Sequence, residues 1–291
     1  MTVDQALTEC AALTRRHSST FFLGSAFFRG DRRRAVSAVY ATCRLGDDAV
    51  DAAPDEREGR ERLAAWWSGV ERAYDGRPDH AVAFEIALAW ALERFDLPRT
   101  AFEELHLGLE TDLACVDLDT IDDLLLYCRR VAGVVGWLVA PIAGYRGGAQ
   151  TLAYALALGQ AMQLTNVLRD VGEDLAMGRC YLPRDLRERH AVDLELLRGG
   201  TITPGYVDLI EDLAERTNAL YREGWRGIPR LHGMASVAVA VAALNYEGIV
   251  QKLRQNGYDN LNRRAFLRPH ERLALIPRAV AGIAGVALRP S

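Results

Sequence analysis

Two stretches of the chain each carry a pair of aspartates four residues apart. The first, "YATCRLGDDAVD", contains Asp47 and Asp51 with Asp48 beside them, and the second, "NVLRDVGEDLAMGRCYLP", contains Asp170 and Asp174. Side chains four residues apart share one face of an α-helix, where like charges destabilise the helix by roughly 0.2–0.5 kcal/mol. Each face is therefore either a solvated surface or the site of a cation.

Further polar side chains precede both pairs at helical spacing. Tyr40 and Arg44 come before the first pair, and Gln163, Asn166 and Arg169 come before the second. Carboxylate and amide oxygens select Mg²⁺, which proteins commonly share between one or two carboxylates and a substrate phosphate. Guanidinium groups are unsuited to a metal ion but form bidentate contacts with phosphate. The two stretches together indicate a metal-bridged diphosphate site, whereas either one alone is typical of a solvated, ion-paired helix surface.

The composition excludes several other classes of protein. The chain has 291 residues, of which 49% are hydrophobic and 25% charged, as in ordinary globular proteins. Its net charge of −4 argues against nucleic acid as the main partner. The five cysteines are scattered without a C-x-x-C pair, which predicts reduced thiols. The N-terminal stretch does not have the pattern of a secretory signal, so we expect a cytoplasmic protein.

The pattern of apolar residues is helical almost throughout. Turn signals such as "DAAPDE", "DGRPD", "DLPRT" and "GGTITPG" separate the helical segments. No linker or low-complexity tract divides the chain, so we expect one all-α domain over residues 1–291 with about ten helices. The predicted helices cover 33–51, 60–74, 82–95, 101–114, 121–137, 150–176, 205–225 and 234–256.

Three segments are strongly apolar, namely 131–145, 234–244 and 273–288. Each is shorter than the roughly 20 residues that a membrane-spanning helix needs, so we expect buried helices. The alternating "VAVAVAAL" in the second could also form a short strand. The last segment carries only Arg278 as a charged residue before its C-terminal end, so peripheral contact with a membrane surface is the alternative to core packing.

At this point the chain resembles a known family, the squalene and phytoene synthases. The resemblance is carried by "RRHSSTFF", "YATCRLGDDAVD", "YCRRVAGVVG", "QLTNVLRDVGEDLAMGRCYLP" and "NGYDNLNRRAF", which occur in the order typical of that family and cover nearly the whole chain. The resemblance implies the all-α isoprenoid synthase fold, a single-domain helical bundle with a central apolar cavity. It also implies prenyl diphosphate substrates held through Mg²⁺, with Mn²⁺ as a substitute.

The resemblance assigns roles to the polar residues one by one. It implies metal ligands at Asp47, Asp48, Asp51, Asn166, Asp170 and Asp174. Contacts with the substrate are implied for His17, Ser18, Arg44, Gln163, Arg169 and Arg263. Tyrosines near the reacting carbons are implied at Tyr40, Tyr127 and Tyr246. Taken singly, each of these tyrosines could equally be a core aromatic residue with a satisfied hydroxyl.

The chain departs from the family pattern at three positions. Ser19 stands where a basic residue often follows "HS", so one diphosphate contact is in doubt and Arg15 or Arg16 is the candidate replacement. Met177 and Val134 also differ from the usual residues, but neither belongs to the implied metal-binding set.

The activity implied by the resemblance is the head-to-head (1′-1) condensation of two prenyl diphosphates. The absence of a C-terminal span and the small residues Gly24 and Ser25 favour two geranylgeranyl diphosphates, giving phytoene through prephytoene diphosphate in carotenoid biosynthesis. That reaction needs no hydride, so NADPH is not expected. The alternative enzyme uses C15 substrates and makes dehydrosqualene, squalene or presqualene diphosphate. A catalytically inactive scaffold protein is the non-enzymatic alternative, and it predicts eroded acids, whereas both pairs are intact.

Overall fold

The computed structural model describes residues 1–17, 27–113 and 117–287, and these ranges are helical with no strand among them. The first half contains α1 (Val3–His17), α3 (Asp31–Asp51), α4 (Glu56–Tyr74), α5 (Ala83–Leu92), α6 (Arg99–Leu113), α7 (Ile121–Cys128), a π-helical turn η1 (Arg129–Gly133) and α8 (Val134–Ala143). The second half contains α9 (Gly148–Arg169), α10 (Val171–Ala176), α11 (Arg184–Arg189), α12 (Leu194–Arg198), α13 (Pro204–Trp225), η2 (Ile228–Arg230), α14 (Met234–Gln255), α15 (Pro269–Leu273) and α16 (Leu275–Ala287). The predicted all-α class is confirmed.

Several helices begin where the sequence supplies a capping side chain. Thr120 and Asp123 form a reciprocal capping box at the start of α7. Thr203 precedes Pro204 and accepts a hydrogen bond from the backbone of Tyr206 at the start of α13. Such side chains satisfy backbone N–H groups that have no partner within the helix, which explains why turn signals in the sequence located these boundaries.

Two predicted helices differ from those observed. The segment 150–176 was expected to be continuous, but α9 ends at Arg169 and α10 begins at Val171, with Asp170 between them at φ −104° and ψ 13°. The segment 121–137 is interrupted by the π-helical turn η1 and then continues as α8 to Ala143. Hydrophobic periodicity tolerates such local changes of winding, and both occur within the family motifs.

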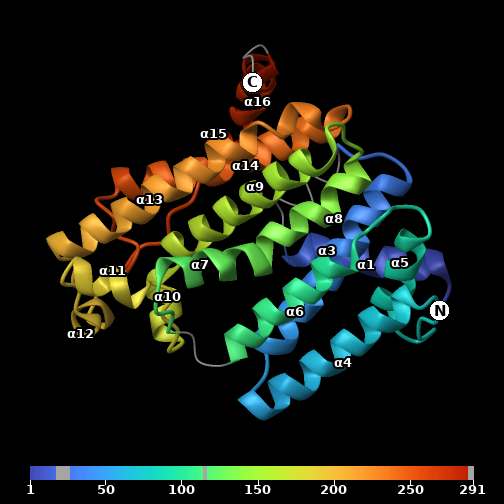
Figure 1. The fold of residues 1–291 in the computed structure, drawn as a ribbon, viewed down its shortest axis with the longest axis horizontal. Helices are drawn as coiled ribbons and strands as arrows, with labels where there is room; N and C mark the ends of the chain where they lie inside the picture. Colours follow the sequence, from blue (N-terminus) through green and yellow to red (C-terminus); the bar gives the residue numbers. More distant parts are fainter. Residues whose placement is uncertain (18–26, 114–116, 288–291) are drawn as a thin grey trace.

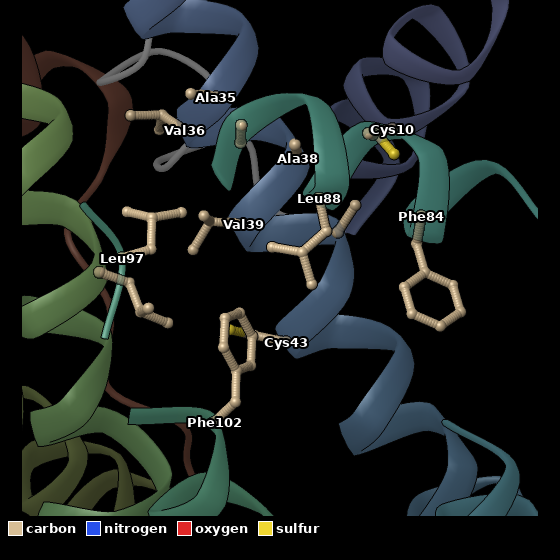
Figure 2. Packing of buried hydrophobic residues seen from close by; sticks show 14 of the residues in the cluster. Cys10, Ala35, Val36, Ala38, Val39, Cys43, Phe84, Leu88, Leu97 and Phe102 are labelled. Atoms are coloured by element: carbon tan, nitrogen blue, oxygen red, sulfur yellow. The ribbon is translucent and has the colours of Figure 1, made fainter. Parts of the chain in front are cut away.

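The helices pack around two large apolar clusters. The first joins α1, α3, α4, α5, α6 and α8, and Figure 2 shows Val36 and Val39 of α3 with Leu88 of α5 and Phe102 of α6 in its centre. The second joins α7, α9, α10, α13 and α14. Figure 1 shows α9, α13 and α14 running side by side, with α16 beyond α14. Because α3 belongs to one cluster and α9 to the other, the two acidic stretches come from different parts of the bundle.

Glycines allow α9 to approach the helices before it very closely. A Cβ atom at Gly159 of α9 would lie 2.4 Å from the carbonyl oxygen of Ala132, and one at Gly136 of α8 would lie 2.5 Å from that of Ala155. Only glycine fits at such distances, since real Cβ atoms do not approach a carbonyl oxygen so closely. The α9 helix therefore lies directly against η1 and α8.

Two stretches are long and apolar enough to cross a membrane by length and composition, Ile121–Ala143 and Met234–Gln255. They are longer than the apolar segments 131–145 and 234–244 of the sequence analysis because the residues that flank those segments are helical too. Both pack against α9, and core helices of globular proteins can have the same length and composition. The run "VAVAVAAL" lies inside α14, so the strand alternative is wrong.

Candidate functional site

The first acidic stretch forms the C-terminal half of α3. Arg44 donates from Nη2 to Oδ1 of Asp48, one turn later, at 2.5 Å. Asp47 has its pKa raised to about 8 by burial; Arg44 opposes this shift, and Asp51, Asp112 and Asp48 add to it by repulsion. Asp47 therefore lies in an environment that disfavours its negative charge unless a cation is present.

The second acidic stretch surrounds the junction between α9 and α10. Asp170 occupies this junction in the bridge region of backbone conformation, which active-site residues often adopt. Its carboxylate accepts two hydrogen bonds from Arg169, from Nε at 2.7 Å and from Nη2 at 2.5 Å. Asp174 lies one turn later, and burial followed by repulsion from Asp170 raises its pKa to about 7.

A distant segment of the chain is held against this junction. Asn260 is buried, accepts a hydrogen bond from the hydroxyl of Tyr206 and donates to the backbone oxygen of Leu168 at 2.5 Å. The backbone N–H of Gly172 donates to the carbonyl oxygen of Asn260 at 3.2 Å. The segment "NGYDNLNRRAF" is thereby tied to the last turn of α9, where helix carbonyls lack partners of their own.

This attachment places Arg264 on the second acidic stretch. Arg264 donates to Asp170 from Nε at 2.9 Å and from Nη2 at 3.3 Å. Its neighbour Arg263, the residue expected from the sequence, lies 3.4 Å from Asp259 and has 77% of its side chain exposed. In this conformation, then, Arg264 rather than Arg263 reaches the acidic site.

The two acidic stretches meet through the segment that follows α10. Arg179 donates from Nη1 to Oδ1 of Asp51 at 2.9 Å, which joins the end of α3 to this segment. Asp112, in the last turn of α6, lies close enough to Asp47, Asp51 and Asp174 to interact electrostatically with both stretches. The fold therefore brings the two aspartate pairs to one acidic mouth, formed by the C-terminal half of α3, the end of α6 and the α9–α10 junction.

One of the candidate metal ligands, Asn166, has a side-chain oxygen without a hydrogen-bond partner among the described residues. Asn166 donates from Nδ2 to Oε1 of Gln163 at 3.1 Å, but its buried Oδ1 has no hydrogen-bond partner among the described residues. A buried amide oxygen without a partner is costly, and a hard cation is a suitable ligand for it. In the described part of the chain, no three His, Cys, Asp or Glu side chains converge to hold a metal alone. This all-oxygen arrangement fits Mg²⁺ shared with a substrate phosphate.

Two tyrosines share one carboxylate at the edge of the acidic mouth. Tyr127 of α7 donates to Oδ2 of Asp112 at 3.2 Å, and Tyr181 donates to Oδ1 at 2.8 Å. Their rings stack with centroids 5.0 Å apart. Burial raises the pKa of Asp112 to about 6, although both hydroxyls oppose that shift. Burial, followed by the charge of Asp112, raises the pKa of Tyr127 as well.

The remaining expected residues are less closely tied to this mouth. Tyr40 is half-buried on α3, four residues before Arg44, and Tyr246 is half-buried on α14 and interacts electrostatically with Arg169. His17 is the exposed last residue of α1. Ser18 lies outside the described residues.

The structure adds four residues that the sequence reasoning did not single out, namely Asp112, Arg179, Tyr181 and Arg264. Arg179 and Tyr181 belong to the motif "GRCYLP", which was used only to recognise the family. Arg264 is adjacent to the arginine that was chosen. Asp112 carries no signal in the sequence, since a single aspartate in an amphipathic helix resembles any solvated residue.

Comparison with known proteins identifies the family of the chain. The sequence model described as squalene/phytoene synthase matches residues 14–271. A phytoene synthase of Thermus thermophilus is 54% identical over 265 residues, which are 91% of this chain and 89% of that protein.

Two solved structures share the fold over most of their length. A dehydrosqualene synthase crystallised with a ligand superimposes with a TM-score of 0.88 at 27% identity, covering 97% of this chain and 98% of that one. A squalene synthase from Alicyclobacillus acidocaldarius gives a TM-score of 0.81 at 30% identity, covering 88% and 95%. The family model covers most of the chain, and the chain belongs to the squalene/phytoene synthase family.

Proposed function

We propose that this protein is a phytoene synthase that condenses two geranylgeranyl diphosphates head to head, through prephytoene diphosphate. The observation that carries the proposal is the meeting of the two aspartate pairs in one acidic mouth, joined by the contact between Arg179 and Asp51. The 54% identity with the Thermus phytoene synthase supports the C20 substrate. Both solved relatives bear the names of squalene-type enzymes, so the shared fold alone does not select the chain length.

The residues proposed to hold Mg²⁺ are the six that the family resemblance implies, Asp47, Asp48, Asp51, Asn166, Asp170 and Asp174. The support for this set is the partnerless oxygen of Asn166 and the raised pKa values of Asp47 and Asp174, which a divalent cation would reverse. When bound, Mg²⁺ or its substitute Mn²⁺ supplies positive charge that neutralises a departing diphosphate.

The arginines of the mouth are proposed to bind the diphosphate. Arg44, Arg169 and Arg264 each hold an aspartate in this structure. If one of these aspartates binds a metal ion, its arginine would be free, and the planar guanidinium group could then form two hydrogen bonds with phosphate oxygens. Arg263, His17, Ser18 and Gln163 stay in the proposed substrate-binding set, with Arg263 requiring a change of side-chain position to reach the acids.

Water must be kept from the carbocations that this reaction forms. Fewer than half of the residues in the most apolar windows of Ile121–Ala143 and Met234–Gln255 are fully buried, 39% and 44% respectively. The wall of an apolar cavity needs apolar side chains that lie on inner helices and keep some accessible surface. We propose that these helices line the central cavity and exclude water there, with Tyr40, Tyr127 and Tyr246 near the reacting carbons.

The deciding experiment incubates the purified protein and Mg²⁺ with C15 or C20 prenyl diphosphate, each with and without NADPH, and identifies the product by mass. We expect phytoene from geranylgeranyl diphosphate, with no dependence on NADPH and no turnover after chelation of the metal. A C30 product formed preferentially from farnesyl diphosphate would replace the proposal with its C15 alternative. A protein that turns over neither substrate would favour the non-enzymatic alternative, a catalytically inactive scaffold protein.

We also propose that residues 1–291 form one domain. We further propose that the protein is cytoplasmic and contacts membranes through α16. This helix exposes Ile276 and Val280, the latter 53% accessible, and Leu273 just before it is 70% accessible. The exposed Arg268 and Arg278 flank this apolar face and suit anionic headgroups. Flotation with anionic vesicles tests the contact, and Val280→Asp is expected to weaken it without changing turnover of detergent-dispersed substrate.

A further inference from the structure

Asp112 occupies a position that is unfavourable for a carboxylate. It lies in the last turn of α6, where the negative end of the helix dipole disfavours an acid and where α6 supplies no basic residue. It is half-buried, and Asp47, Asp51 and Asp174 add repulsion from both acidic stretches. An uncharged amide of the same shape would avoid these costs. Arg179 and two tyrosine hydroxyls favour the charged form, but the pKa of Asp112 is still raised, so the negative charge is unfavourable on balance.

The contacts of Asp112 are divided between two tyrosines. Tyr127 donates to one carboxylate oxygen at 3.2 Å and Tyr181 to the other at 2.8 Å. The two hydroxyls come from α7 and from the segment after α10, so a single side chain of α6 sets the position of both. The ring stacking, at 5.0 Å between centroids and 28° between planes, keeps the pair together.

These hydrogen bonds determine which further interactions the two phenol oxygens can make. A phenol has one hydrogen to donate and lone pairs that accept. Once the hydrogen is bound to Asp112, each oxygen can only accept hydrogen bonds or face positive charge. The negative carboxylate also polarises the O–H bond and leaves more electron density on the phenol oxygen.

We propose that Asp112 is a positioning residue, which holds the hydroxyl hydrogens of Tyr127 and Tyr181 so that the Tyr127 oxygen presents lone pairs to the cationic intermediates. The proposal rests on the proposed function, because that reaction passes through allylic and cyclopropylcarbinyl cations. Fixed dipoles aimed at developing charge stabilise it without reorganisation. Without Asp112, the hydroxyl of Tyr127 is free to rotate, so its hydrogen is no longer held away from the cation.

The test is a mutant cycle on the purified enzyme with Mg²⁺ and whichever prenyl diphosphate the wild type turns over. The variants are Asp112→Asn, Tyr127→Phe, the double variant and Tyr181→Phe. An asparagine keeps the shape but offers an N–H group to one of the tyrosines, so we expect kcat to fall about tenfold to a hundredfold. KM and the Mg²⁺ concentration for half-maximal rate should stay within about twofold. The double variant should be no slower than Tyr127→Phe, because Asp112 acts through Tyr127.

Stability separates this role from a structural one. Removing the charge should leave the melting temperature of Asp112→Asn unchanged or raised while kcat falls, which a structural residue would not do. Glu110→Gln is the matched control, since Glu110 is exposed in the same turn of α6 and contacts neither tyrosine. It should relieve the same helix dipole and leave kcat unchanged.

Several results would overturn the proposal. The first is an Asp112→Asn protein with full kcat. The second is that the effects of Asp112→Asn and Tyr127→Phe add in the double variant. The third is a large rise in the Mg²⁺ requirement of Asp112→Asn, which would make Asp112 a metal ligand. If Asp112→Asn fails to fold, Tyr127→Phe decides, since it removes the phenol oxygen that Asp112 is proposed to orient and keeps the ring; a kcat equal to the wild type would contradict the proposal. A wild type without turnover of any prenyl diphosphate would instead overturn the proposed function, and this inference with it.

Discussion

At the scale of single residues, arginines form ion pairs with three of the aspartates in the acidic mouth. Arg44 holds Asp48, Arg169 and Arg264 hold Asp170, and Arg179 holds Asp51. Each pair brings together a proposed metal ligand and a cation suited to phosphate. Because these partners must separate for both to bind their ligands, metal and diphosphate binding are expected to promote each other.

Asn166 differs from Asp48, Asp51 and Asp170 because its buried oxygen has no hydrogen-bond partner within the described chain. We expect Asn166→Leu to leave the free energy of unfolding within about 1 kcal/mol of the wild type, since the removal of an unsatisfied buried carbonyl offsets the lost hydrogen bond to Gln163. The same variant should raise the Mg²⁺ concentration for half-maximal rate by roughly 10–100-fold, since a proposed ligand is lost. Thermal unfolding and metal titration of the rate measure the two effects.

Asn166→Asp is the matched control for that experiment. It keeps an oxygen of the same reach, so the Mg²⁺ requirement should stay much closer to that of the wild type. Equal metal requirements in Asn166→Leu and the wild type would remove Asn166 from the proposed ligand set.

At the scale of elements, the break between α9 and α10 shapes the second half of the site. A continuous helix would keep Asp170 in the α conformation and would pair the N–H of Gly172 with the carbonyl of Leu168 instead of leaving both to Asn260. The observed break exposes the carbonyl of Leu168 to Asn260 and brings the backbone of Gly172 against Leu261. Arg264 reaches Asp170 because this segment is held there.

Gly172→Ala should therefore damage the site through the docked segment. A Cβ atom at this position would lie 2.2 Å from the carbonyl oxygen of Leu261, so backbone must move. We expect a lower melting temperature, although alanine favours helix more than glycine does by roughly 0.8–1.0 kcal/mol. We also expect a higher KM for the prenyl diphosphate, because Arg264 moves away from Asp170.

Gly285→Ala supplies the control, since Gly285 lies in α16 and a Cβ there meets nothing within 4 Å. That variant should be as stable as the wild type or more so, with an unchanged KM. If Gly172→Ala behaves like Gly285→Ala, the docking of the 256–266 segment does not position Arg264.

At the scale of the whole molecule, the bundle gathers acids from three separate parts of the chain. Asp47, Asp112 and Asp174 have pKa values raised to about 8, 6 and 7, all above the ordinary value of 3.8 and all chiefly through burial. Between pH 4 and pH 8 the folded protein therefore holds more protons at these groups than the unfolded chain does. Stability falls wherever the folded state binds more protons and the pH rises.

We accordingly expect the metal-free protein to lose stability as the pH rises from about 4 to about 8 through these groups. The stabilising protonated forms are fully present below pH 4 and lost as the pH passes each folded pKa. Melting temperatures of the wild type and of Asp47→Asn across this range provide the measurement. The variant should show a shallower decline, and Mg²⁺ with inorganic diphosphate should flatten the decline of the wild type. Parallel curves for the two proteins would contradict the assignment of the effect to Asp47.

The sequence by itself determined the helical class, most helix boundaries and the two aspartate pairs. These features follow from short-range physics: periodicity reports which face is buried, capping residues satisfy helix ends, and a four-residue spacing places two acids together. The motifs also identified the family, which the comparisons confirmed. The ligand and substrate roles of the individual residues remain predictions.

Only the tertiary structure decided which residues meet around those pairs. The contact between Arg179 and Asp51 joins positions 128 apart in the chain, and that between Arg264 and Asp170 joins positions 94 apart. Asp112 gains its two tyrosines from α7 and from the segment after α10, and nothing in its local sequence distinguishes it from a solvated residue. The physical reason is that spacing describes neighbours along one helix, whereas charge neutralisation, burial and hydroxyl orientation depend on which helices pack together.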